Sequence, residues 1–399
     1  MNIRIIKNVM ESNDSYIRDE YMIQTQIYES GYEKIESIKI FLYDLNKNVT
    51  TEVAASIPKY NLIDIKDINK DTSYIFFTSI EKSEDSQKHN IMLYRYSILT
   101  EQCDKIYSFE ESLDKYADYM RTKVFIINEY YFLIQNEFLR ANLTEEYADY
   151  LEYEIYMYSI NEGKSYKITD ERFTRYGIMS LQAVSANNCV IKLGYDLLKD
   201  SRYKIFKKNE AAMESVSFVN IGQMVSDILL GQQEIVLNTI ENVYYSVTIP
   251  YVKLDNDYII YSKVKLDEKL EEEIIFYNLT TKDTTICINN NIKDSEKPAH
   301  TCIICDTPYI IRNGAKGSEF IDVKGKNATF YINKDDEISN IIGNIMIVDQ
   351  YSKGVFGKVK PCVTVYKLPH LKVLHREKGC HIASTMVKDE QLYVVMKRG

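Results

Sequence analysis

The chain has 399 residues, of which 45% are hydrophobic, so it can bury a substantial core. Its net charge of −9 argues against nucleic acid or an anionic membrane as the main partner, because either needs a basic face. No apolar run approaches the ~18 residues of a membrane-spanning helix, and the first residues lack a signal-peptide pattern. The seven cysteines have no disulfide-framework spacing. We therefore expect a cytoplasmic protein with reduced thiols, a monomer or weak oligomer.

The predicted strands are short and rich in Tyr, Ile, Val, Phe and Thr. The chain has 34 tyrosines and no tryptophan, and tyrosine suits strands that are buried on one side and wet at their edges. The segment from Thr122 to Thr169 holds one complete unit of four such strands, with turns at Glu129 and Tyr130 and at Asn161 to Lys164. A single unit cannot cover its own faces, so copies must pack side by side.

Hairpins of this kind recur along the chain. Second hairpins of the predicted units begin near residues 39, 91, 153, 203, 273, 319 and 362. First hairpins precede them, and one further strand pair, IASTMVKDEQLYVVMKRG, follows the last. First hairpins predict eight four-stranded antiparallel blades and second hairpins predict seven; we favour eight. Residues 234–264 hold one strand more than a blade needs, so their assignment stays open.

The last strand pair has no second hairpin after it. Its partner is most simply the N-terminal strand NIRIIKNV, which would close a ring by pairing the two ends of the chain. Closure removes the exposed edges that an open sheet presents to other chains. We therefore expect one all-β domain over residues 1–399.

This pattern resembles the β-propeller superfamily over essentially the whole chain. The degenerate repeats of an apolar residue, Tyr, Asn or Asp, Leu and a turn are similar to those of bacterial cytosolic propellers with seven or eight blades. Without tryptophan, the Trp-Asp repeats and the sialidase-type boxes cannot be present, so no specific family is identified. The resemblance implies a fold and no activity.

Catalytic and metal motifs are scarce. There is no His-Glu-x-x-His, Gly-x-Ser-x-Gly or Gly-x-Gly-x-x-Gly pattern. Cys302 and Cys305 have the spacing of a metal knuckle, but residues three apart in a strand point to opposite faces. We expect buried apolar thiols there, and we predict no metal and no cofactor.

Acidic residues fall in the predicted first-hairpin turns. If these turns share one face beside a central channel, their carboxylates would form a collar that could hold a cation or a basic peptide. Tight turns also favour short polar residues without any site, and we weigh this explanation more heavily. The candidate collar consists of Asp19, Glu20, Glu129, Asp306, Asp349, Asp389 and Glu390.

Arginine and tyrosine gather around the third unit. In an acidic protein such a group could grip a carboxylate or phosphate by forked hydrogen bonds. The alternative, which we favour, is a solvated rim paired with neighbouring acids such as Asp170 and Glu171. The candidate binding residues are Arg121, Arg140, Tyr147, Tyr150, Arg172, Arg175 and Tyr176.

These observations favour a non-enzymatic scaffold that binds a protein or peptide through its long-loop face or central funnel. The scarcity of catalytic motifs and the tyrosine content support it, since tyrosine gives contact area at little entropic cost. Two alternatives remain open. The chain could be a hydrolase or lyase acting on a small polar substrate in the funnel, or a sensor of a small ligand.

Overall fold

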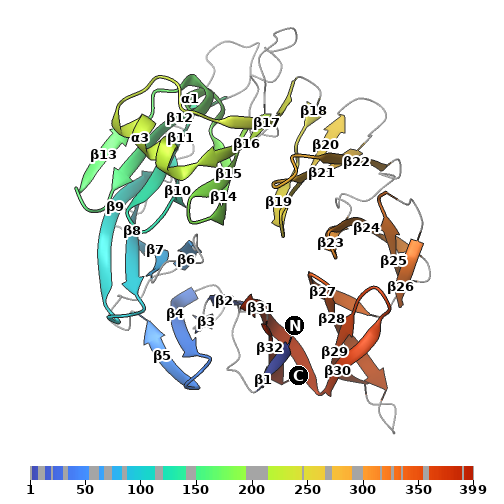
Figure 1. Cartoon of the computed structure of the whole chain (residues 1–399). Coiled ribbons are helices and arrows are strands. Elements are labelled where there is room, and N and C mark those ends of the chain that lie inside the picture. The colour runs from blue at the N-terminus through green and yellow to red at the C-terminus, as the bar shows by residue number, and fades with distance from the viewer. Residues whose placement is uncertain are drawn as a thin grey trace. The chain divides into compact units, whose positions relative to one another are not determined.

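The strands form eight sheets in the part of the chain that the structure describes. Six of these sheets have four strands, one has five and one has three. The chain is therefore an eight-bladed β-propeller, which confirms the predicted all-β fold (Figure 1). The computed structural model describes residues 2–7, 14–18, 21–29, 35–53, 63–66, 74–82, 88–112, 120–140, 150–194, 214–244, 247–265, 272–289, 300–314, 317–324, 328–333, 336–353, 359–388 and 391–398.

Blades are numbered in chain order, and the first four come from the N-terminal half. Blade 1 comprises β2 (Asp14–Arg18), β3 (Tyr21–Glu29), β4 (Ile35–Asp44) and β5 (Val49–Val53). Blade 2 comprises β6 (Ile63–Lys66), β7 (Tyr74–Lys82), β8 (Lys88–Ser97) and β9 (Cys103–Ser112). Blade 3 comprises β10 (Met120–Ile126), β11 (Tyr131–Arg140), β12 (Tyr150–Ser159) and β13 (Lys164–Lys167). Blade 4 comprises β14 (Ile178–Ser185), β15 (Asn188–Gly194), β16 (Glu214–Asn220) and β17 (Asn238–Val243).

The other four blades come from the C-terminal half and the first strand. Blade 5 comprises β18 (Val247–Thr248), β19 (Val252–Asp255), β20 (Tyr258–Lys265), β21 (Glu272–Asn278) and β22 (Thr284–Asn289). Blade 6 comprises β23 (His300–Ile304), β24 (Thr307–Gly314), β25 (Gly317–Asp322) and β26 (Ala328–Asn333). Blade 7 comprises β27 (Glu337–Ile342), β28 (Ile345–Lys353), β29 (Val359–Lys367) and β30 (Lys372–Lys378). Blade 8 comprises β31 (Cys380–Lys388), β32 (Gln391–Arg398) and β1 (Asn2–Lys7).

The chain divides into two compact units. Unit 1 contains blades 6, 7 and 8 and unit 2 contains blades 2, 3 and 4. Unit 1 consists of residues 1–26, 42–50 and 250–399, and unit 2 of residues 27–41 and 51–249. The expectation of one domain over residues 1–399 stays a prediction.

The N-terminal strand completes blade 8, as predicted. β1 pairs with β32 from Asn2 opposite Gln391 to Lys7 opposite Met396. This pair is parallel, whereas the sequence predicted antiparallel blades. Strands alternate in direction within a blade, so β1 occupies the third position but runs in the direction of a fourth strand. That direction is the one required of a strand that leads into the first strand of the next blade.

Blade 3 is the unit predicted between Thr122 and Thr169. The carboxamide of Asn128 closes the turn between β10 and β11, since its Oδ1 accepts hydrogen bonds from the backbone N–H groups of Tyr130, at 2.9 Å, and Tyr131, at 3.0 Å. An Asn side chain that caps its own turn in this way fixes the register of a short hairpin.

Two short helices pack against blades 3 and 4. Helix α1 (Glu171–Tyr176) follows β13 and contacts β12 and β15, and helix α3 (Ile221–Leu229) follows β16 and contacts β16 and β13 (Figure 1). Gly177 ends α1 with φ of 68°, and a Cβ there would lie 2.7 Å from the Tyr153 ring, so glycine meets both requirements. The predicted helix near residues 222–230 is thereby confirmed.

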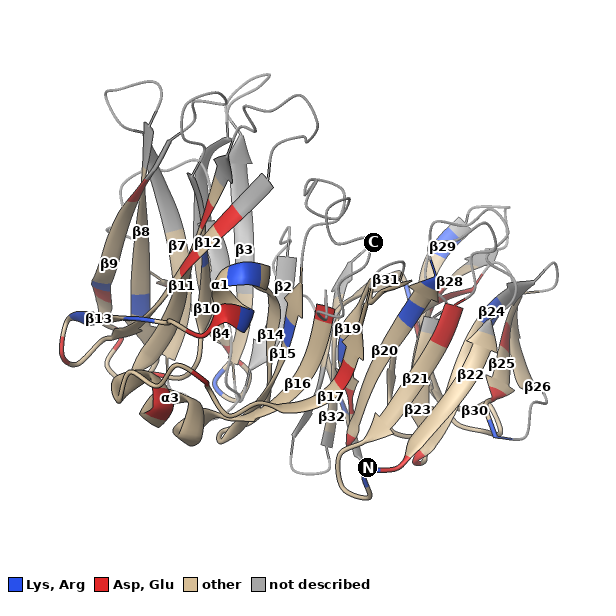
Figure 2. Cartoon of the chain, turned by 90° about the horizontal axis from the view of Figure 1, so that it is seen from above, with Lys and Arg blue, Asp and Glu red and all other residues tan. Residues whose placement is uncertain are grey.

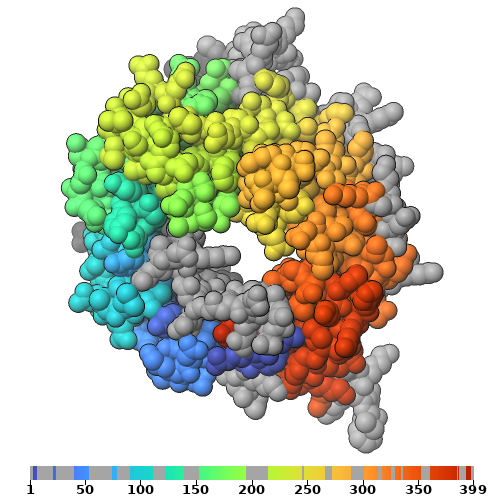
Figure 3. Space-filling view, viewed as in Figure 1, coloured from blue at the N-terminus to red at the C-terminus, as the bar shows by residue number. Residues whose placement is uncertain are grey.

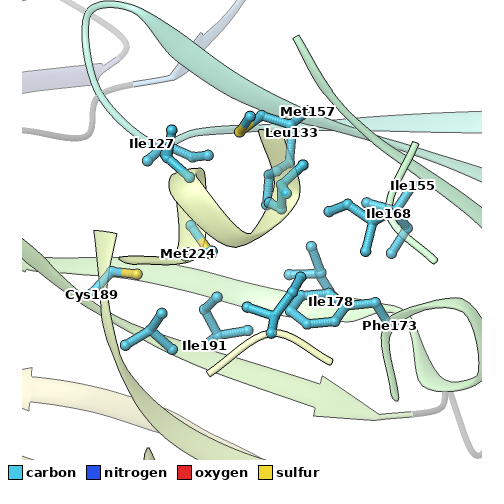
Figure 4. Close-up of a cluster of buried hydrophobic side chains, with 14 of the residues drawn as sticks. Ile127, Leu133, Ile155, Met157, Ile168, Phe173, Ile178, Cys189, Ile191 and Met224 are labelled. Carbon is cyan, nitrogen blue, oxygen red and sulfur yellow. The ribbon is translucent and has the colours of Figure 1, made fainter. Parts of the chain in front are cut away.

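The core between blades 3 and 4 includes side chains from both helices. Phe173 of α1 and Met224 of α3 pack with Leu133, Ile155 and Ile191 from the neighbouring strands (Figure 4). The second strand β15 is buried at six successive positions, because side chains cover both of its faces. The outermost strand β13 is mostly exposed. Burial therefore falls from the inner strands to the outer strand of a blade.

Side chains also join successive blades by hydrogen bonds to the backbone. In unit 2, the carboxamide of Gln135 in β11 accepts from the N–H of Ile178 at 2.5 Å and donates to its C=O at 3.2 Å. Gln135 is 1% exposed, so this two-point contact satisfies a buried amide while it ties blade 3 to β14. We call such a contact a clasp.

Two hairpins differ from the sequence prediction. The segment MIVDQYSKGVFGKV was predicted as a first hairpin, but it spans β28 and the start of β29, the second and third strands of blade 7. The first strand is β27, whose sequence EISNII was not counted. In blade 4, β16 is the third strand, and α3 separates it from the fourth, β17. Residues 234–264, left open by the sequence, supply β17 to β19 and most of β20.

We expect the terminal pairing to make a large contribution to stability. Ile6 of β1 is 8% exposed and packs with Met22, Leu45 and Val395. Ile6→Ala should lower the free energy of unfolding by about 2–4 kcal/mol, because it removes buried methylenes and leaves a cavity. Urea denaturation followed by circular dichroism measures this loss. Ile288→Ala is the control, since Ile288 is 54% exposed and should change stability by less than about 0.5 kcal/mol; equal losses would contradict the role of β1.

Candidate functional site

A buried carboxylate organises the junction between helix α1 and the loop before β17. Asp170, which is 2% exposed, caps α1 by accepting from the backbone N–H of Arg172 at 2.9 Å. The same carboxylate accepts from Nε of Arg172 at 3.0 Å and from Nη2 at 2.5 Å. It also accepts from the N–H of Ile235 at 2.8 Å, while Nη2 of Arg172 donates to the C=O of Ile235 at 2.6 Å. The Asp170–Arg172 pair thus forms a clasp on Ile235.

A second carboxylate holds the same loop from helix α3. Asp227, which is 6% exposed, accepts from the N–H of Val236 at 3.0 Å and from Nε2 of Gln223 at 2.7 Å. Asn220 caps the start of α3 by accepting from the N–H of Gln223 at 2.9 Å. The loop from α3 to β17 is therefore fixed at two successive residues and lies on the surface of unit 2, in yellow-green in Figure 3.

A buried ion pair lies beneath this junction. Lys192 of β15 and Glu214 of β16 are 7% and 4% exposed, with Nζ and Oε1 separated by 3.2 Å. Lys192 donates to the C=O of Ile249, and Oε2 of Glu214 accepts from its N–H and, at 3.0 Å, from the Thr248 hydroxyl. A Cβ at Gly194 would lie 2.7 Å from the Glu214 side chain, so glycine lets Glu214 cross the strand. This pair is the clasp between blades 4 and 5.

A pocket of about 230 Å³ lies between these two ion pairs, wholly within unit 2. Leu193 and Leu237 give it apolar walls, and hydroxyl, amide and guanidinium groups supply polar ones. Helix α1, β15, β16 and β17 thus all contribute to one concave surface, the usual form of a small-ligand site. Its lining residues are Arg172, Tyr176, Leu193, Glu214, Ser215, Leu237, Thr239 and Asn242.

The clasp on Ile235 orients the guanidinium of Arg172 at the pocket. Its Nε and Nη2 atoms are engaged by Asp170 and Ile235, whereas Nη1 makes no hydrogen bond within the described part of the chain. The side chain is 41% exposed. On the same helix, the guanidinium of Arg175 lies 5.6 Å from the ring centroid of Tyr176. Figure 2 shows acidic and basic side chains together on α1.

The pKa of Asp170 is lower than that of an ordinary aspartate. Burial alone would raise this pKa, but the hydrogen bonds from the Arg172 side chain and from the N–H groups of Ile235 and Arg172 outweigh it. The hydrogen bond to Asp170 in turn raises the pKa of Arg172. Both groups therefore stay charged at neutral pH, and the clasp is an ion pair.

The structure brings two of the predicted binding residues, Arg172 and Tyr176, together at the pocket. Arg175 lies on the same helix. Arg121 and Arg140 are opposite ends of the β10–β11 hairpin, near Met120 and Tyr150 in register, and their side chains lie outside the described part of the structure. Tyr150 begins β12, again without a described side chain, and Tyr147 lies outside the described residues.

Sequence reasoning missed the strand residues of the pocket. Ser215, Thr239 and Asn242 are common polar residues in strands and carry no motif. The one available signal was charge in apolar segments: Lys192 interrupts the buried run NCVIKLG, and a lysine there requires a partner such as Glu214.

The acidic residues of the predicted collar have different environments. Glu129 lies in the β10–β11 turn and Asp306 in the β23–β24 turn, where Cys305 and Asp306 have φ of 47° and 61°. Asp349 is not in a turn. It lies in β28, because the turn of that hairpin falls at Gly343 and the following residue. The remaining members, Asp19, Glu20, Asp389 and Glu390, lie outside the described residues. The collar itself stays a prediction.

Asp349 contributes to the junction of blades 7 and 8. Its carboxylate accepts from the N–H of Ile382 and from the Ser339 hydroxyl, both at 3.4 Å. Burial raises the pKa of Asp349, and the nearby carboxylate of Glu337 adds to this effect, against opposing contributions from Ile382 and His381. Asp349 thus differs from Asp170 in the direction of its pKa shift because its hydrogen bonds are long and it lacks an arginine partner.

The cysteines are all free thiols. Cys302 is buried in β23 and Cys305 is exposed in the following turn. Burial raises the pKa of Cys302 and of Cys189 to about 12. Among the described residues, no three His, Cys, Asp or Glu side chains are grouped as a metal site. Within the same residues, no helix is long and apolar enough to cross a membrane.

Comparison with known proteins finds peptidase propellers. No protein-family model matches the chain, and no curated protein matches its sequence. The β-propeller domain of the Trilobed protease from Pyrococcus furiosus is 10% identical with a TM-score of 0.44, over 90% of this chain and 95% of that one. The acylaminoacyl peptidase of Pyrococcus horikoshii is 10% identical with a TM-score of 0.43, over 90% of this chain and 52% of the peptidase. Prolyl oligopeptidase B from Galerina marginata is 9% identical with a TM-score of 0.44, over 87% and 45%.

These comparisons correct the functional prediction. A non-enzymatic scaffold for a protein or peptide partner was predicted, and this prediction is wrong, because the similar propellers belong to peptidases. The chain spans about half the length of the acylaminoacyl peptidase and of prolyl oligopeptidase B. At such low identity the likeness is one of fold alone, and it assigns no activity to this chain.

We expect the clasp on Ile235 to be important for stability. Asp170→Asn should lower the free energy of unfolding by about 2–3 kcal/mol at neutral pH, less than for a fully buried pair because Arg172 is partly exposed. The folded pKa of Asp170 is lowered, so its contribution is present above the unfolded value of about 3.9 and is lost as pH falls through the folded value. Denaturant titrations at several pH values should show the difference from wild type shrinking in acid. Glu171→Gln, at the exposed neighbouring position, is the control, and an equal effect there would contradict the clasp.

Asp349→Asn should have the opposite pH dependence. The folded pKa of Asp349 is raised, so the folded state binds its proton more tightly than the unfolded state and loses stability as pH rises. The amide keeps one acceptor oxygen for Ile382 and removes the buried charge. The stability of Asp349→Asn relative to wild type should therefore increase from pH 4 to pH 7, as measured by thermal unfolding across that range. A relative loss of stability over the same range would show that the charge itself is favourable.

Proposed function

We propose that this chain binds a small polar ligand in the pocket between helix α1 and blade 4. The observation that carries the proposal is the orientation of Arg172. Two of its three nitrogens are held by Asp170 and Ile235, and the third is unpaired within the described residues at a pocket of about 230 Å³. A guanidinium fixed in this way loses little conformational entropy when a ligand oxygen accepts from it.

The other pocket groups support binding ahead of turnover. Ser215 brings a hydroxyl to the pocket, but both oxygens of its neighbour Glu214 are already engaged by Lys192, Thr248 and Ile249. A carboxylate held in this way is a poor general base, because it must give up a hydrogen bond to take a proton. Recognition of a small ligand is therefore the function that this geometry favours.

Blocking the pocket tests this proposal. Thr239 lies exposed on the outermost strand β17, so Thr239→Trp should fill the pocket without disturbing the core. We expect ligand-observed NMR with a panel of monosaccharides, sugar acids, sugar phosphates, amino acids and nucleosides to find a ligand for the wild type. Its affinity should fall at least about tenfold in the variant, or 1.4 kcal/mol.

Thr284→Trp is the matched control, because Thr284 is an exposed threonine on β22, the outermost strand of blade 5. It should bind as the wild type does. Absence of any ligand across the panel, or equal binding by Thr239→Trp, would overturn the proposed function.

A further inference from the structure

The charges around the pocket are already compensated by the protein. Arg172 is paired with Asp170 through Nε and Nη2, the fork that would otherwise grip a carboxylate. Glu214 is paired with Lys192 at 3.2 Å. An anionic ligand would gain little from an arginine whose charge is neutralised and would lie near the carboxylate of Glu214. A cationic ligand would meet the unpaired edge of the guanidinium.

Uncharged hydrogen-bonding groups provide the rest of the polar surface. Ser215 and Thr239 offer hydroxyls, which donate and accept, and Asn242 offers a carboxamide with both functions. The Nη1 atom of Arg172 adds two N–H donors. Such a mixture matches a ligand with several hydroxyl groups, each of which also donates and accepts.

Apolar surface completes the match. Leu193 and Leu237 line the pocket, together with Tyr176. The C–H faces of a sugar ring are apolar and pack on such side chains, while its hydroxyls point outward to polar partners. The volume of about 230 Å³ is below the roughly 300–1,000 Å³ of pockets for drug-sized ligands, so it suits a molecule of one ring.

We infer that the ligand is an uncharged, hydroxylated molecule of one ring, in the class of neutral monosaccharides. This inference rests on the proposed function and names the chemistry of its ligand. It differs from the expectation of a carboxylate or phosphate, because Asp170 occupies the fork of Arg172 that those groups would need.

Matched sugars that differ only in charge test the inference. Glucose, galactose and mannose are compared with glucuronate, glucose 6-phosphate and glucosamine, each titrated into the full chain and followed by saturation-transfer NMR. We expect at least one neutral sugar to bind about tenfold or more tightly than its charged relatives. Its affinity should change less than about twofold between 50 mM and 500 mM NaCl, since screening does not act on an uncharged ligand. Thr239→Trp should abolish this binding and Thr284→Trp should keep it.

The outcomes separate the inference from the proposed function. Tighter binding of a charged sugar, with loss of affinity in salt and in Thr239→Trp, would overturn the neutral-ligand inference and leave the pocket as a binding site. Binding of amino acids or nucleosides in place of any sugar would do the same. Failure of every member of the panel would overturn both.

Discussion

The fold depends on side chains of one blade that hold the backbone of the next. Between blades 3 and 4 the two functions of a single carboxamide, Gln135, meet the N–H and C=O of Ile178. Between blades 4 and 5 an ion pair divides the same task, with Lys192 on the C=O and Glu214 on the N–H of Ile249. Backbone groups at these junctions are buried, and leaving one unpaired would cost about 1–3 kcal/mol. Different residues therefore meet the same physical requirement.

Unit 1 meets this requirement with carboxylates. Asp255 of β19 accepts from the N–H of Ile303 at 3.1 Å, and Asp349 of β28 accepts from that of Ile382 at 3.4 Å. Burial raises the pKa of both groups, so these single-point contacts hold their charge at a cost in free energy. The clasps of unit 2 avoid that cost by using a neutral amide or a complete ion pair. Propeller junctions of equal geometry can thus differ in how they respond to acid.

The blades were predictable from sequence and the junctions were not. Alternating strands and Asn-capped turns are local signals, and they predicted blade 3 almost residue by residue. EISNII was missed in blade 7 because it lacks the aromatic residues of the other strands, and that omission placed Asp349 in a turn. The clasps join residues 43 to 65 positions apart, so no local pattern reports them. Arg172 and Tyr176 were found because arginine and tyrosine are conspicuous, whereas Ser215 and Thr239 are not.

Charge that is used to build a fold is no longer available to attract ligands. The sequence presents Arg172 as one of several arginines in an acidic chain, which suggests an anion site. In the folded chain its fork is filled by Asp170, and that pairing is required because Asp170 is 2% exposed and an unpaired carboxylate there would be costly. What remains at the pocket is a rigid N–H edge of little net charge. The demand for a satisfied interior therefore converts an apparent anion site into a surface suited to uncharged hydroxyl groups.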